Sequence, residues 1–94
     1  MKLVYARRAV RRLAEIADFI RARNPAAAGN VERVIRDTIA RLECYPSAGR
    51  SVQPGVGVLA VPKLPYSMYD NITEAEQIVT VITIRHTAQK RLPS

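Results

Sequence analysis

An interruption of two residues, Asn24-Pro25, separates two amphipathic segments and constrains the fold more than any other feature of the chain. In both segments apolar residues recur at spacings of three and four, with charged residues between them. The first stripe consists of Val10, Leu13, Ile16, Ala17 and Ile20, and the second consists of Val31, Val34, Ile35, Thr38, Ile39 and Leu42. This period predicts two helices, one from Ala6 to the RARNP sequence and one from Pro25 to about Cys44.

The Asn24-Pro25 pair also predicts how the two helices are joined. A residue that precedes proline is driven out of the helical region, so the first helix should end at Asn24. Asn24 can then cap the second helix, with Pro25 at its first position, where no backbone N–H is needed. Because the connection is so short, the two helices are expected to form an antiparallel hairpin.

The rest of the chain is typical of β structure. The run KLVY at 2–5 indicates a short initial strand. Three further strands are expected at VLAV (58–61), YSMYDNI (66–72) and QIVTVITIRH (77–86), with TEAE (73–76) as the turn before the last. The last run is rich in β-branched residues and apolar on both faces, which predicts a central strand.

Two stretches rich in proline or glycine interrupt this β region. Residues 45–57, YPSAGRSVQPGVG, are expected to form a loop with turns and no regular element. Pro62 and Pro65 bracket the end of the second strand, which favours an edge or a bulge that is open to strand addition by a partner. The expected fold is α+β: a short strand, an antiparallel helical hairpin, and a three-stranded antiparallel meander in one sheet packed on the helices.

Length and charge limit the classes of function. The 94 residues support a single domain, 1–94, with a basic tail at about 87–94. Fifteen Lys and Arg against eight Asp and Glu give a net charge of +7, and residues 1–23 hold seven of the cations and two of the acids. Such a field attracts nucleic acid or an acidic protein partner, although a merely solvated basic helix face is the alternative.

Few residues are suited to catalysis or metal binding. Cys44 and His86 are the single cysteine and histidine, so neither a disulfide nor a metal cluster is expected, and no cofactor. Ser47, His86 and Asp70 are the side-chain types of a catalytic triad, but no strained elbow sequence surrounds any serine. No run of 18 apolar residues and no apolar stretch behind a basic N-terminus occurs, which predicts a cytoplasmic protein without membrane contact.

Five segments carry a family resemblance through their order and spacing. They are RRLAEIADFI and NPAAAGNVERVI in the hairpin, YPSAGR at 45–50, LAVPKLPY at 59–66 and VITIRHTAQKR at 81–91. Together they resemble the RelE/ParE superfamily of bacterial type II toxin–antitoxin toxins over essentially the whole chain. The resemblance implies a cognate antitoxin and one of two targets: RelE-like toxins cut messenger RNA at the ribosome, and ParE-like toxins poison DNA gyrase.

Three positions favour the ParE-like alternative. Compared with the family pattern, Gly57 replaces a commonly basic residue, Ser67 replaces the catalytic arginine of RelE-like toxins, and Asp70 replaces an aromatic residue. Cleaving RNA without a metal requires a base, an acid and cations aimed at the phosphate. On this interpretation Asp70 would repel phosphate, and one misplaced charge at about 5 Å costs on the order of 3 kcal/mol.

We therefore expect a ParE-like toxin that inhibits gyrase by binding and catalyses nothing itself. The expected target-binding residues are Arg50, His86, Lys90 and Arg91. Two alternatives remain: a ribosome-dependent endoribonuclease, and an inactive homologue retained as the antitoxin's partner. The nuclease would use His86, Arg50, Arg85 and Lys90.

The expected partner is a ParD-like antitoxin, an acidic segment that folds on binding. Its apolar anchors should enter the helix grooves and its acids should meet arginines. The expected antitoxin-binding residues are Arg8, Arg11, Arg12, Leu59 and Val61. Specific DNA binding by this chain alone is not expected, because operator recognition in these systems generally belongs to the antitoxin.

Overall fold

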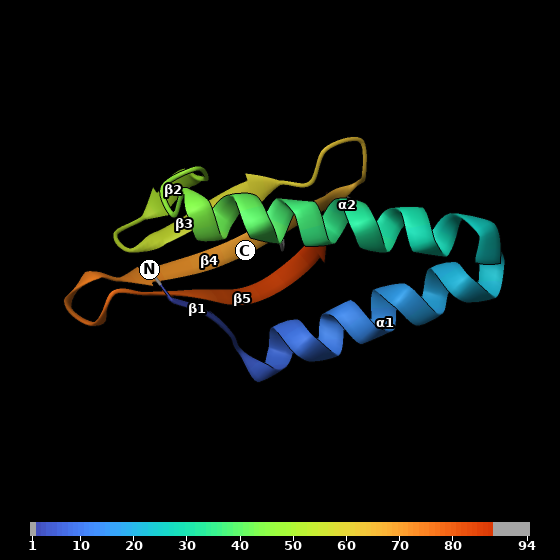
Figure 1. Ribbon diagram of the computed structural model, residues 1–94, viewed down its shortest axis with the longest axis horizontal. Helices are drawn as coiled ribbons and strands as arrows, with labels where there is room; N and C mark the ends of the chain where they lie inside the picture. The colour runs from blue at the N-terminus through green and yellow to red at the C-terminus, as the bar shows by residue number, and fades with distance from the viewer. Residues whose placement is uncertain (1, 88–94) are drawn as a thin grey trace, which may run out of the picture.

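The computed structural model describes residues 2–87, which form two α-helices and a five-stranded sheet (Figure 1). The helices are α1 (Arg7–Arg23) and α2 (Pro25–Cys44). The strands are β1 (Lys2–Tyr5), β2 (Arg50–Gln53), β3 (Val56–Ala60), β4 (Tyr66–Thr73) and β5 (Ile78–His86). A short 3-10 helix, η1 (Glu74–Glu76), connects β4 to β5, where the sequence predicts the turn.

The strands are ordered β1-β5-β4-β3-β2 across the sheet. β1 pairs in parallel with β5, with Lys2 opposite Ile78, and every other neighbouring pair is antiparallel, so the sheet is mixed. β5 lies inside the sheet, as its apolar sequence predicts. The predicted α+β class and the predicted order of elements are confirmed, with β2 as an additional strand.

Asn24 joins the helices as the sequence predicts. Its side-chain Oδ1 accepts a hydrogen bond from the Ala27 N–H at 3.2 Å, and Pro25 stands at the start of α2. The Asn24 N–H donates to the Ile20 carbonyl at 2.7 Å, which closes the last turn of α1. The two helices therefore meet at this end, run back in opposite directions and diverge with distance from the connection (Figure 1).

The hydrophobic core lies between the helices and one face of the sheet, which we call the helix face. It combines apolar residues of α1 and α2 with residues of β3, β4 and β5. Along β4, Tyr66, Met68 and Asp70 are buried on this face, and the residues between them are partly exposed on the other, which we call the open face. Because successive side chains of a strand point to opposite faces, the burial pattern of β4 shows which face each of its residues occupies.

Residues 45–57 are not irregular throughout, so this part of the prediction is wrong. Arg50–Gln53 form β2, which pairs with β3 at the edge of the sheet. Gly55, with a φ of 78°, makes the turn between the two strands. A Cβ at Gly49 would lie 2.9 Å from the Val58 carbonyl oxygen, so only glycine allows this approach. These glycines give the segment the composition of a loop, and the four exposed residues of β2 have no apolar alternation that would indicate a strand.

The run VLAV (58–61) does not belong to an edge strand, although its end beside the prolines has no partner on the β2 side and the β2–β3 pairing contains a bulge. β3 lies between β2 and β4, and its pairing with β4 has no bulge. Pro62 and Pro65 lie in the connection between β3 and β4, where the Val61 N–H donates to the Tyr66 carbonyl at 3.0 Å. The missing proline N–H groups therefore fall outside the ladder of the sheet, where they cost nothing. The edge strands are β1 and β2.

Replacing Asn24 with alanine should lower the free energy of unfolding by about 0.5 kcal/mol, because the Ala27 N–H loses its side-chain acceptor and keeps only the backbone carbonyl of residue 24, at 3.0 Å. Urea denaturation followed by circular dichroism measures this change. Asn24→Asp keeps an acceptor oxygen at the same place and is the matched control, with a much smaller loss expected. Equal losses in the two variants would show that the side-chain cap does not stabilise the hairpin.

Candidate functional site

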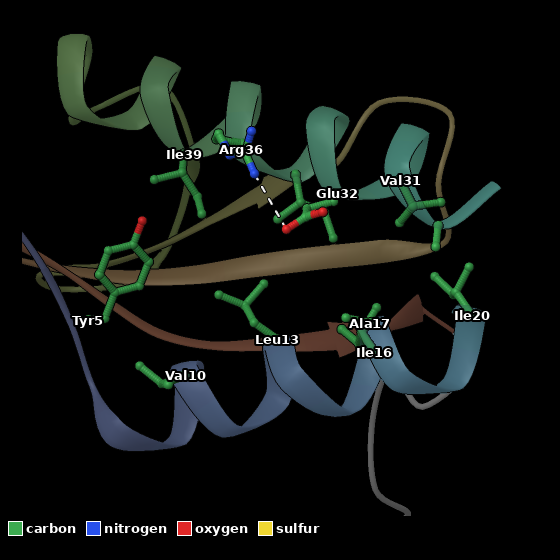
Figure 2. A pocket seen from close by; sticks show the side chains of 12 residues that line it. Tyr5, Val10, Leu13, Ile16, Ala17, Ile20, Val31, Glu32, Arg36 and Ile39 are labelled. Carbon is green, nitrogen blue, oxygen red and sulfur yellow. Dashed lines mark ion pairs between the residues drawn. The ribbon is translucent and has the colours of Figure 1, made fainter. Parts of the chain in front are cut away.

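A largely apolar hollow of about 350 Å³ lies between the two helices, and we call it the helix groove (Figure 2). Most of its lining comes from the apolar stripes of α1 and α2. The lining residues are Tyr5, Val10, Leu13, Ile16, Ala17, Ile20, Ala28, Val31, Glu32, Ile35, Arg36 and Ile39. An ion pair between Arg36 and Glu32, with 3.4 Å between nitrogen and oxygen, adds its main polar groups. The helices diverge with distance from their connection (Figure 1), and the groove lies between their apolar stripes.

A second hollow of about 360 Å³ lies between α1 and the end of the sheet, and we call it the His86 hollow. Its lining residues are Arg12, Glu15, Ile16, Phe19, Tyr66 and His86. The Tyr66 and His86 rings pack edge to face with their centres 5.4 Å apart. Arg12 Nε donates to the Ile84 carbonyl at 3.2 Å, and its Nη1 pairs with Glu15 at 2.9 Å. This hollow therefore combines aromatic rings with fixed charges.

His86 and Arg50, both predicted to bind the target, lie on opposite faces of the sheet. His86 is opposite Tyr66, and both side chains line the hollow on the helix face. Arg50 is opposite Val58, which is in turn opposite Tyr69. Tyr69 lies between two residues of β4 that are buried on the helix face. Because paired residues share a face, Arg50 belongs to the open face.

The open face brings Arg50 together with a second arginine and an aromatic ring. Arg85 is opposite Ser67 on this face, and its guanidinium carbon lies 6.0 Å from the centre of the Tyr69 ring. Three strands therefore contribute cations and an aromatic ring to one surface, which suits contact with an acidic partner. The remaining predicted target-binding residues, Lys90 and Arg91, lie outside the described residues.

A sequence model of the family described as ParE toxin of type II toxin-antitoxin system, parDE, matches residues 3–91. The chain belongs to the ParE toxin family. A solved structure from the chromosomal ParDE toxin–antitoxin system of P. aeruginosa has the same fold. Its TM-score is 0.78, with 24% sequence identity and coverage of 92% of this chain and 95% of that chain. No curated protein matches the chain at a significant level.

This ParE-family chain does not bring together the residues that the nuclease alternative would use. Arg50 and Arg85 lie on the open face, whereas His86 lines a hollow on the helix face. Ser67 occupies the open-face position opposite Arg85, where the RelE-like pattern has an arginine. The sheet therefore separates the imidazole from both guanidinium groups among the described members of this set, and Lys90 lies outside the described residues.

Asp70 does not face a surface where it would repel phosphate, so this part of the sequence interpretation is wrong. It follows Tyr66 and Met68 on the helix face and is 1% exposed. Its Oδ2 has no hydrogen-bond partner among the described residues, and burial raises the pKa of the carboxyl group. Gly57 is opposite Asp70, and a Cβ at that position would lie 3.3 Å from Oδ2. The absent side chain of Gly57 therefore leaves room for the carboxyl group.

The predicted antitoxin-binding residues fall into two groups. Arg8 and Arg11 are exposed on α1, and Arg12 is partly exposed at the His86 hollow. Leu59 and Val61, by contrast, are 8% and 2% exposed and belong to the hydrophobic core. The side chains of Leu59 in β3 and of Val61, which follows β3, therefore face the core and not the solvent.

Residues 2–87 contain neither a cluster suited to a metal ion nor a helix suited to a membrane. In this range no group of three or more His, Cys, Asp or Glu side chains is placed to hold a metal ion. The helices in the same range lack the length and apolar character needed to cross a membrane. Cys44 is exposed and forms no disulfide within the described part of the chain.

Two exposed side chains that line the hollows, Val10 and Phe19, were not predicted from the sequence. Val10 lines the helix groove and is 55% exposed, although its place in the apolar stripe predicts burial. Phe19 lines the His86 hollow and is 54% exposed, and it belongs to neither predicted stripe. The sequence does contain a sign of this exposure. With Val10 and Phe19 included, the apolar residues of α1 cover a wider arc of the helix than a single packing surface can bury.

Burial of Asp70 should make stability depend on pH. Its pKa in the folded chain is raised above the ordinary value of 3.8, so the native state retains a proton that the unfolded chain releases. This contribution to stability is present below pH 3.8 and is lost as the pH rises through the raised value. Asp70→Asn removes the titration, so the stability of this variant relative to the parent should increase as the pH rises from 3.8 through the raised pKa.

Urea denaturation of the parent and the variant across this pH range measures that difference. Asp37→Asn, at an exposed position of α2, is the matched control and should show no such increase. A difference between Asp70→Asn and the parent that stays constant with pH would contradict the prediction.

Proposed function

We propose that this chain is a toxin that inhibits DNA gyrase by binding to it, and that a cognate ParD-like antitoxin neutralises it in the cytoplasm. The observation that carries the proposal is the match to the ParE toxin family over residues 3–91. The family description names a type II toxin–antitoxin system, so a partner protein is part of the function. The proposal assigns to this chain alone neither a catalytic step nor specific DNA binding.

The helix groove supports the antitoxin part of the proposal. An amphipathic helix can lay its apolar face into such a groove, with anchoring side chains at helical spacing. α1, which forms one wall of the groove, carries six arginines against two acids. An acidic segment that is disordered alone would bury its apolar anchors in the groove and meet Arg8, Arg11 and Arg12 where it leaves the groove across α1.

Raising the NaCl concentration from about 0.05 M to about 0.5 M should slow association with the antitoxin about tenfold and change dissociation less. The physical reason is that salt screens the long-range attraction between the arginines and the acidic segment. Surface plasmon resonance with the protein encoded by the adjacent upstream reading frame measures both rates.

A charge-matched pair of variants tests whether the position of the arginines matters. Arg8→Gln combined with Arg11→Gln should associate more slowly and depend less on salt. Arg33→Gln combined with Arg41→Gln removes the same charge from exposed positions of α2 and should have the smaller effect. An association rate that ionic strength leaves unchanged would eliminate the electrostatic part of the proposal.

The end of β5 supports the target part of the proposal. Arg85 is directed to the open face, which also carries Arg50, and the adjacent His86 lines a hollow on the helix face. A large protein that contacts this end of the sheet can reach groups on both faces. We assign target contact to these residues together with Lys90 and Arg91, which follow in the chain.

The purified chain at micromolar concentration should inhibit supercoiling by gyrase or increase gyrase-dependent DNA cleavage. Arg50→Ala should weaken this effect about tenfold or more, because it removes one of the proposed target contacts. Arg41→Ala, at an exposed position near the end of α2, is the matched control and should leave the effect unchanged. If the parent chain affects neither supercoiling nor cleavage, the gyrase proposal is wrong.

Two further measurements separate the alternatives in that case. Codon-specific 5′ ends of transcripts after expression would indicate a ribosome-dependent nuclease. Unchanged transcripts and unchanged growth would indicate an inactive homologue retained as the antitoxin's partner.

A further inference from the structure

The His86 hollow lies on the opposite flank of α1 from the helix groove. Val10 and Leu13 line the groove, Arg12 and Phe19 line the His86 hollow, and Ile16 lines both. α1 is therefore a ridge between two hollows of similar size, about 350 and 360 Å³. Ile16 is 6% exposed and lies in the core beneath α1, so a chain bound in one hollow reaches the other by crossing the exposed side of the helix, a width of about 10 Å.

The flank of α1 beside the His86 hollow is cationic and carries an exposed aromatic ring. Arg8, Arg12, Glu15, Phe19 and Arg23 follow one another at spacings of three or four residues, so they lie along one side of the helix. Glu15, the acid among these five, is paired with Arg12. The guanidinium carbon of Arg23 lies 4.3 Å from the centre of the Phe19 ring. The flank therefore fits a partner segment in which an apolar side chain is accompanied by acids.

The floor of the His86 hollow is already ordered. Arg12 is tied to β5 through the Ile84 carbonyl, and the Tyr66 ring packs against the edge of His86. Binding to groups that are held in place costs less conformational entropy than binding to mobile ones. Two of the five N–H donors of Arg12 make its contacts with Ile84 and Glu15, and the others can bind a carboxylate of a partner.

We propose that the antitoxin passes from the helix groove around α1 and into the His86 hollow. There it places an apolar side chain against Phe19 and Tyr66 and an acidic side chain on Arg12. This inference rests on the proposed function, which assigns the antitoxin to the helix groove. Its consequence is that the bound antitoxin covers His86, a residue assigned to target contact, so it neutralises the toxin by direct masking.

Three serine substitutions at exposed apolar or aromatic positions test the path of the antitoxin. Phe19→Ser in the His86 hollow should weaken antitoxin binding about tenfold or more, as loss of a buried aromatic anchor does. Val10→Ser tests the helix groove in the same way. Tyr45→Ser is the matched aromatic control, because Tyr45 is 69% exposed and lines neither hollow. Isothermal titration with the protein encoded by the adjacent upstream reading frame gives the affinities, and circular dichroism verifies each fold.

A measurement on the unmodified toxin covers the case in which Phe19→Ser fails to fold. The chain contains one histidine, so a toxin with ¹³C-labelled histidine and no histidine tag gives imidazole signals from His86 alone. Addition of unlabelled antitoxin should shift these signals, and modification of His86 by diethyl pyrocarbonate should become about tenfold slower because the ring is covered.

The outcomes distinguish this inference from the function on which it rests. A weaker affinity for Phe19→Ser and not for Tyr45→Ser, or slower modification of His86 in the complex, supports the inference. Antitoxin binding that depends on Val10 but not on Phe19, with His86 signals and modification unchanged, overturns the inference and leaves the proposed function intact. If the unmodified toxin does not bind the antitoxin at all, both fail.

Discussion

The alternation of side chains along β4, fixed by the burial of every second residue beneath the helices, determines which residues of this protein can act together. Tyr66, Met68 and Asp70 occupy the helix face, so Tyr69 must occupy the open face. Pairing transfers this assignment to β3 and β5, and through β3 to β2. A shift of one residue in β4 would exchange the two faces and expose the core, which is why the register is strongly specified.

Parts of the fold that depend on local chemistry could be predicted from the sequence. Asn24 and Pro25 determine where one helix ends and the next begins, because both residues act on the backbone next to them. The composition of β5 indicates a central strand because its residues are buried on the helix face and at least partly buried on the open face. β2 could not be predicted in this way, since its four residues are exposed and their strand conformation comes from pairing with β3.

The candidate site was harder to predict from the sequence. Which residues act together depends on the face of the sheet that each side chain occupies, and the spacing of residues along the chain does not reveal this. Arg50 and His86 both lie near the ends of β segments, and nothing in their immediate sequence shows that the sheet separates them. Asp70 is misleading for a related reason. Acids are rarely buried without a partner, so the sequence favours a solvent-facing or active-site position, whereas the absent side chain of Gly57 makes room for the carboxyl group inside.

The parallel pairing of β1 with β5 restricts when the protein can fold during its synthesis. Lys2 lies opposite Ile78 and Tyr5 opposite Val81. β1 therefore cannot pair until β5, which is synthesised much later, is available. β5 also separates β1 from β4, and without it the remaining strands form no continuous sheet. A nascent chain therefore cannot complete its core until residue 86 has emerged from the ribosome, and folding follows translation of this segment.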